Sequence, residues 1–394
     1  MPLPESYENL VAKAEELEKE HPAEAAEIFH RILNRLGRLS RETLEKRMDL
    51  GDLAIRVGVR GNYLYRRVGN FDAAQEVAEQ LGRLRPRLRH EAEALKAYAL
   101  ADAGRLDEAM ELLQKTAESS EADDDLKLRL AAEALWHARP DAGLALLDGV
   151  IAEEVTEDNR EILSDAWYLR SRAMIQAGRA EEAEQSFLES KRLSEDDPPS
   201  TRELVDAFIS WGDLDKALQY ADMDPNMAGR GLLRGIVAAL KGKQEWARDE
   251  WWRVTREPFD ADDDEGLAAW LECALRQGDT DKASAAIQAA REKHGVTPRL
   301  LLFFMIVRAQ EGEVVEAADG MRMLARVHKE LRPARIRLVR DSDRLLIEQA
   351  APDPEARQAL IEALFSDPSE VEPADEELPA DAEPAEEPDT KESP

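Results

Sequence analysis

The stretch Gly178-Arg-Ala-Glu-Glu-Ala183 places an alanine five positions after a glycine, and it decides the fold because it recurs along the chain. The same Gly-to-Ala spacing starts at residues 69, 104, 212, 242, 278 and 312, and a variant runs from Ala138 to Gly143. Successive starts lie 30 to 40 residues apart, about 35 on average. A period of this length indicates a solenoid of stacked helix hairpins.

Each unit has a simple physical interpretation. The glycine takes the left-handed backbone conformation that ends a first helix without a Cβ clash. The small residue five positions later lies in a second helix, where a larger side chain would push the two helices apart. The eight residues expected at this packing position are Ala74, Ala109, Gly143, Ala183, Ala217, Ala247, Ala283 and Ala317.

These repeats resemble those of the tetratricopeptide repeat (TPR) family. Trp167, Gly178 and Ala183 match the family spacing of its tryptophan, turn glycine and packing alanine. The resemblance covers roughly residues 56–333. It implies an all-α fold, a right-handed superhelical solenoid of about eight to ten antiparallel helix hairpins, with first helices lining a concave groove.

The ends of the chain are less regular than its middle. We expect residues 1–55 to form a degenerate capping hairpin and most of an extra helix, which begins at Arg41 and extends to Val57 at the start of the array. The repeat array over 56–333 and a capping hairpin over 334–365 follow. Residues 366–394 contain 12 Asp or Glu, 6 Pro and one Lys. A segment of that composition cannot bury enough apolar surface to fold, so a disordered acidic tail is predicted.

Composition excludes several classes of protein. The formal net charge of −31 disfavours a nucleic-acid partner, and no stretch is long and apolar enough to span a membrane. The single Cys and the six His have no metal-ligand spacing, and no Gly-rich phosphate loop or nucleophile motif is present. We therefore expect no catalysis, no metal and no cofactor, and a cytoplasmic location because no leader is visible.

The expected function is that of a scaffold or adaptor that binds a segment of another protein in the groove. Arg and Tyr are the residue types that most often anchor protein interfaces. In the frame of the TPR resemblance, those expected on the groove are Arg56, Tyr63, Arg66, Tyr98, Tyr168, Arg172 and Arg202.

Two alternatives remain open. Residues 31–90 hold 14 Lys or Arg against 7 Asp or Glu, so the acidic tail could mask a basic N-terminal patch that binds an anionic ligand, such as an acidic protein or nucleic acid. A weaker alternative is self-association of chains through their terminal repeats.

Overall fold

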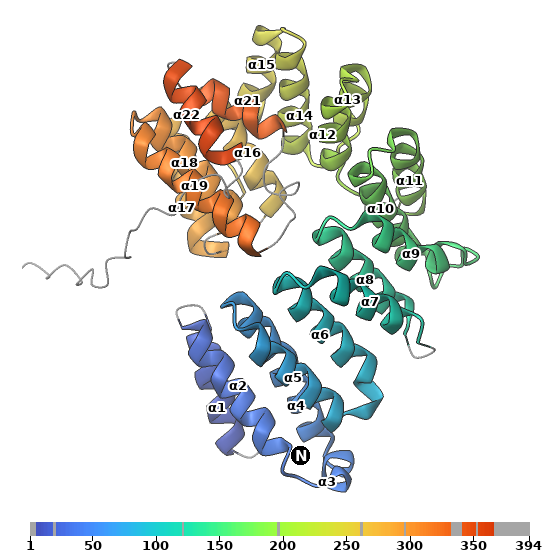
Figure 1. The fold of residues 1–394 in the computed structure, drawn as a ribbon. Helices are drawn as coiled ribbons and strands as arrows, with labels where there is room; N and C mark the ends of the chain where they lie inside the picture. Colours follow the sequence, from blue (N-terminus) through green and yellow to red (C-terminus); the bar gives the residue numbers. More distant parts are fainter. Residues whose placement is uncertain are drawn as a thin grey trace, which may run out of the picture.

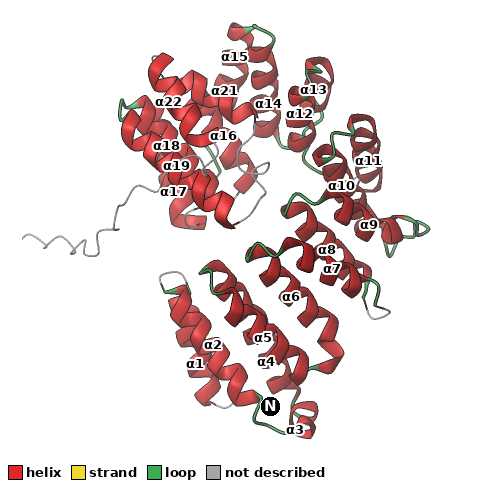
Figure 2. Cartoon of the chain, viewed as in Figure 1, coloured by secondary structure: helices red, strands yellow, loops and turns green. Residues whose placement is uncertain are grey.

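The structure is a computed structural model that describes residues 5–18, 21–119, 122–194, 198–260, 263–294, 297–331, 341–351 and 354–365. Over these ranges the chain contains helices and connecting loops but no strand (Figure 2). The predicted tail over 366–394 lies outside the described residues. The fold is an all-α solenoid of TPR-like helix hairpins, as the sequence predicts.

The helices follow one another as hairpins with short turns. The N-terminal half comprises α1 (Glu5–Leu17), α2 (Pro22–Leu36), α3 (Arg41–Lys46), α4 (Met48–Arg67), α5 (Phe71–Leu84), η1 (Pro86–Leu88), α6 (Arg89–Asp102), α7 (Leu106–Ala117), α8 (Asp124–Trp136), α9 (Pro140–Ile151), α10 (Arg160–Gln176) and α11 (Ala180–Leu193). The C-terminal half comprises α12 (Arg202–Ser210), α13 (Leu214–Ala221), α14 (Met227–Leu240), α15 (Gln244–Thr255), α16 (Asp264–Gln277), α17 (Thr280–His294), α18 (Pro298–Gln310), α19 (Val314–Leu331), α21 (Asp341–Ala350) and α22 (Pro354–Phe365).

Consecutive hairpins stack side by side and curve into an open array (Figure 1). Each even-numbered helix from α4 to α18 is the first helix of its hairpin, and it contacts the following odd-numbered helix. From α8 to α15, the first helices lie toward the inside of the curve and the second helices toward the outside (Figure 1). This arrangement defines a concave face built mainly from first helices.

The hairpin turns have the backbone predicted from their glycines. All seven turn glycines, from Gly69 to Gly312, have φ between 71° and 97°. In the variant turn Ala138 takes φ 53°, the one positive φ of a non-glycine residue among the described residues. The turn therefore requires the left-handed conformation even where the sequence does not supply glycine.

The small residue after each turn is buried against the preceding helix. The seven alanines at this position are fully buried, and a Cβ on Gly143 would come within 2.9 Å of Leu135 on α8. In two hairpins a polar side chain of the first helix also bonds this position: Asn62 donates to the carbonyl of Ala74 at 2.8 Å, and Ser171 to that of Ala183 at 2.8 Å. The close contact is thus both steric and hydrogen-bonded.

Where one helix carries a large side chain at the contact, the other carries glycine. A Cβ on Gly235 of α14 would come within 2.1 Å of the Trp251 ring from α15, and a Cβ on Gly320 of α19 within 2.1 Å of Met305 from α18. Trp251 is buried, and its Nε1 donates to the Leu232 carbonyl at 3.3 Å. Because a large side chain on one helix faces a glycine on the other, the two helices can remain close together.

The N-terminal region differs from the helix expected over Arg41 to Val57. The short helix α3 ends at Lys46, and α4 begins at Met48 and runs without a break through residue 55. The extra segment therefore lengthens the first helix of a hairpin, because residues such as Leu53 and Ala54 continue its buried face.

The last unit departs from a regular hairpin. Helix α22, not α21, packs beside α19 at the end of the array. Helix α21 instead contacts α12, α16 and α18, which are three first helices, so it lies across the concave face (Figure 1). Helix α22 begins at Pro354, because the fixed φ of proline suits the first turn of a helix.

Replacing Ala138 by Gly tests the turn directly. We expect the free energy of unfolding to rise by about 0.5–1 kcal/mol, because a left-handed residue with a Cβ is strained and glycine's freedom in the unfolded chain offsets part of the gain. The reciprocal control is Gly178→Ala, whose Cβ would meet nothing within 4 Å, so only backbone strain should lower stability. Urea unfolding followed by circular dichroism measures both; a destabilising Ala138→Gly would contradict the account.

Candidate functional site

The candidate site is the concave face formed by the first helices of the array. Helices α4, α6, α8 and α10 form its N-terminal half, and α12, α14, α16 and α18 form its C-terminal half. Among the described residues, the four N-terminal helices contact mainly their neighbours along the array, whereas α21 covers part of the C-terminal half. The two halves therefore present different surfaces.

Two of the seven residues predicted on the groove are exposed on α4. Tyr63 has 54% of its surface accessible, and Arg56 is exposed as well. Val59 lies between them at 43%, and the spacings of three and four residues place all three on one stripe of the helix. This stripe combines an aromatic ring, an aliphatic side chain and a cation.

Arg66 and Tyr98 are instead tied into the array. Arg66 Nε donates to Asp102 Oδ2 at 2.7 Å, and Arg66 Nη2 lies 3.4 Å from Glu133 Oε1, so one side chain of α4 links α6 and α8. The Arg66 guanidinium also lies 5.2 Å from the centre of the Tyr98 ring. Burial raises the pKa of the Tyr98 phenol, and the nearby Glu133 carboxylate raises it further.

His137 completes this cluster, and the sequence analysis did not identify it as part of a site. Its Nε2 lies 3.2 Å from Glu133 Oε1 and 3.8 Å from Asp102 Oδ1, and its side chain is fully buried. One nitrogen and two carboxylates within 4.8 Å of one another resemble a metal-ligand set. Arg66, however, already brings a positive charge to both carboxylates, so the geometry fits an ion network between repeats.

The remaining predicted groove residues follow the same pattern. Arg172 Nε donates to Glu203 Oε2 of the next first helix at 2.6 Å, and its guanidinium lies 6.0 Å from the centre of the half-buried Tyr168 ring. Arg202 Nη2 donates to Glu272 Oε2, two hairpins farther on, at 2.7 Å. These arginines link first helices of different hairpins and are not free anchors.

Glu272 is the centre of the C-terminal network. Its carboxylate is 1% exposed and accepts from Arg202 and Arg276 at 2.7 Å each and from Arg299 at 3.2 Å. Arg299 also bonds Asp343 of α21 through Nη1 at 2.6 Å. The network therefore connects α12, α16, α18 and the helix that lies across them.

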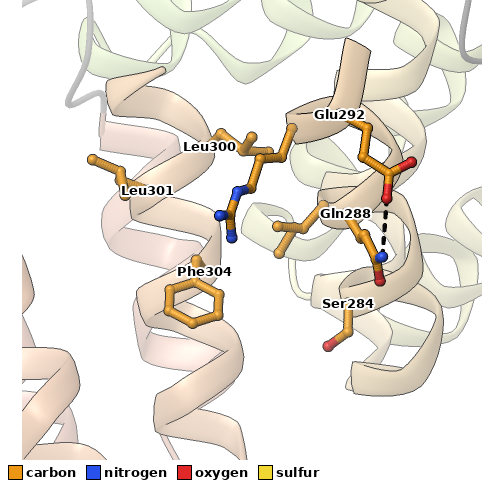
Figure 3. Close-up of a pocket in the computed structure, with 8 residues that line it drawn as sticks. Ser284, Gln288, Glu292, Leu300, Leu301 and Phe304 are labelled. Atoms are coloured by element: carbon orange, nitrogen blue, oxygen red, sulfur yellow. Dashed lines mark hydrogen bonds between the residues drawn. The ribbon is translucent and has the colours of Figure 1, made fainter. Parts of the chain in front are cut away.

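A cavity of about 570 Å³ opens between α17 and α18 (Figure 3). Ile287, Leu300, Leu301 and Phe304 give it an apolar wall. The polar lining is formed by Ser284, Gln288, Arg291 and Glu292, with a hydrogen bond of 3.0 Å from Gln288 to Glu292. This lining contains no paired nucleophile and base, and it suits an apolar side chain of a ligand.

The basic N-terminal segment is partly neutralised by its surroundings. Arg60 bonds Glu15 of α1 at 3.2 Å and Glu18, which directly follows α1, at 2.6 Å, and Arg66 is paired as described above. Acids from outside residues 31–90 thus offset cations within them. Because residues 366–394 lie outside the described residues, masking of this segment by the tail remains a prediction.

Comparison with known protein families finds no match, and comparison with curated proteins finds none either. Solved structures with a similar chain path include PilF of Pseudomonas aeruginosa, with 17% identity, 52% of this chain and 92% of that chain covered, and a TM-score of 0.38. A TPR protein of Parabacteroides merdae matches with 13% identity, 77% and 99% coverage and a TM-score of 0.37. The TPR domain of P58(IPK) matches with 16% identity, 91% and 97% coverage and a TM-score of 0.22.

Such distant likenesses carry no information on binding or activity. Within the described residues, no helix has both the length and the apolar character that crossing a membrane requires.

The Arg66 network can be tested by removing its cation. We expect Arg66→Ala to lower the free energy of unfolding by about 3 kcal/mol, because it leaves the buried Asp102 carboxylate and the partly buried Glu133 carboxylate without their guanidinium. Arg105, whose ion pair with Glu108 is exposed, provides the control, and Arg105→Ala should leave the unfolding midpoint nearly unchanged. Equal midpoints for both variants would refute the structural role of Arg66.

Proposed function

We propose that the protein is a non-catalytic scaffold that holds a segment of another protein along the inner face of α4 to α10. The observation that carries this proposal is the exposed stripe of Arg56, Val59 and Tyr63 on α4. Aromatic and guanidinium groups supply much of the binding energy at protein interfaces, and an aliphatic neighbour excludes water around them.

Ion pairs between neighbouring first helices fix the inner face on which the stripe is proposed to act. The Arg66 and Arg172 ion pairs join successive first helices, so the inner face is preorganised before a ligand arrives. Preorganisation lowers the entropy lost on binding. In this proposal Arg66, Arg172 and Arg202 shape the groove, Tyr98 and Tyr168 contribute ring edges to its surface, and Arg56 and Tyr63 make the principal contacts.

A protein ligand suits this face better than a nucleic acid. The net charge of the chain is −31, which repels a phosphate backbone at long range. Locally, Arg66 is already engaged by two carboxylates and has little capacity left for phosphate. An extended or helical peptide can instead bury side chains against Val59 and Tyr63.

The test compares a double variant on α4 with a single control variant, and the control residue is as exposed as Val59. Val59→Asp combined with Tyr63→Ala should abolish recovery of a defined partner in affinity capture followed by mass spectrometry, because it removes the apolar and aromatic contacts. Leu188 on the second helix α11 is also 43% exposed, so Leu188→Asp controls for a new surface charge and should leave recovery unchanged. Partner recovery that is identical for both variants would exclude this face of α4.

A further inference from the structure

We propose that the cavity between α17 and α18 is a docking site for the acidic C-terminal segment of the same chain, residues 366–394, with Leu378 as its anchor. In this proposal the Leu378 side chain packs in the cavity, and a carboxylate from the acids directly before it pairs with Arg291. One wall of this site is a second helix of the array, and the proposal does not rest on the function proposed for α4 to α10.

Helix α18 carries more apolar surface than the array covers. Residues 300–307 are eight consecutive apolar residues, and a run of more than two helical turns places apolar side chains on every side of the helix. Phe303 and Ile306 are buried in the core. Phe304, by contrast, is 42% exposed and forms an apolar wall of the cavity with the half-buried Leu301 (Figure 3). A ligand that covers this wall removes apolar surface from water.

The facing wall, on α17, supplies a cation. Arg291 lines the cavity, is exposed, and has no hydrogen bond or ion pair among the described residues. The acid beside it, Glu292, already accepts a hydrogen bond of 3.0 Å from Gln288 of the same helix (Figure 3). A guanidinium without a partner opposite an apolar wall suits a ligand that combines a carboxylate with an apolar side chain.

Two segments of this chain outside the described residues, 332–340 and 366–394, carry opposite charges. The first contains four Arg and no acid, so it would bring like charges to Arg291. The second contains 12 Asp or Glu and one Lys, which complements the guanidinium. The cavity therefore suits residues 366–394, which begin directly after α22.

Residues 366–394 also contain a suitable anchor. Their only large apolar side chains are Val371 and Leu378, and three consecutive acids, residues 375–377, directly precede Leu378. In an extended chain, adjacent side chains point to opposite sides. Leu378 can therefore face the apolar wall on α18 while the acid before it faces Arg291 on α17.

The length of the connection favours Leu378 over Val371. The last described residue is Phe365 in α22, which packs against α19, and α19 packs against α18 (Figure 1). Since packed helices lie about 8–10 Å apart, the path from α22 past α19 to the cavity covers roughly 20–30 Å. An extended chain spans at most about 3.5 Å per residue, so Val371 reaches about 20 Å from Phe365 and Leu378 about 45 Å. Leu378 can thus enter the cavity, whereas Val371 reaches at most its edge.

A nitroxide label on the full chain tests this docking. The single cysteine, Cys273, is fully buried, and burial raises the pKa of its thiol, so Ala380→Cys provides one reactive site close to Leu378. A docked segment gives a slowly moving component in the electron paramagnetic resonance spectrum, and we expect this component in the labelled chain. Leu378→Asp should reduce it at least about threefold, because a carboxylate is unfavourable against the apolar wall.

Charge variants test the role of Arg291. Arg291→Glu should also reduce the slow component at least about threefold. Arg248 on α15 is likewise exposed and without a hydrogen bond or ion pair among the described residues, so Arg248→Glu is the matched control and should leave the spectrum unchanged. Replacing residues 375–377 by Lys in the Arg291→Glu chain should restore the slow component, because both sides of the ion pair are then reversed. Equal spectra for Arg291→Glu and Arg248→Glu would overturn the proposal.

Three further outcomes would also overturn it. A slow component that disappears on dilution would mean that the cavity holds the C-terminal segment of a second copy. A slow component that is insensitive to Leu378→Asp would place the segment elsewhere, such as on the basic residues 31–90. A label without any slow component would leave the cavity to a different occupant. Leu378→Asp lies outside the helices of the array, so its result does not depend on the folding of α17 and α18, and circular dichroism checks the folding of the Arg291→Glu chain.

Discussion

The structure depends on one close contact between the two helices of each hairpin. A left-handed turn residue reverses the chain, and five positions later a side chain no larger than a methyl group lets the helices touch. Where that contact carries Trp251 or Met305, the facing helix supplies Gly235 or Gly320. Since the two helices of every hairpin are held at nearly the same separation, stacking the hairpins produces a regular curve.

Ion pairs on the inside of this curve connect first helices of different hairpins, which the contacts within each hairpin do not link. Arg66 links three first helices, Arg172 links two, and Glu272 gathers three arginines from α12, α16 and α18. Such buried pairs add little net stability compared with apolar packing, but removing one partner is expensive. Their consequence is geometric: they fix the spacing of the inner face on which any ligand must bind.

The sequence predicts the hairpins well because their determinants are local. A glycine, an alanine and a period of about 35 residues suffice to locate the turns. The inner ion pairs were missed, although a signal exists: Arg66 and Asp102 are 36 residues apart, and Arg172 and Glu203 are 31 apart, about one repeat each. The position of α21 could not be predicted from the sequence. It depends on the curvature of the array, which brings α12 and α18 close enough for both to contact α21.

The hairpins stack into an open, curved array, and small-angle X-ray scattering of residues 1–365 tests this arrangement most directly. A compact globule of that length has a radius of gyration of about 21 Å. The stacked hairpins around an open concave face predict a clearly larger radius, with a pair-distance distribution skewed toward long distances. A radius near 21 Å with a symmetric distribution would mean that the hairpins collapse on one core, and the account would be wrong.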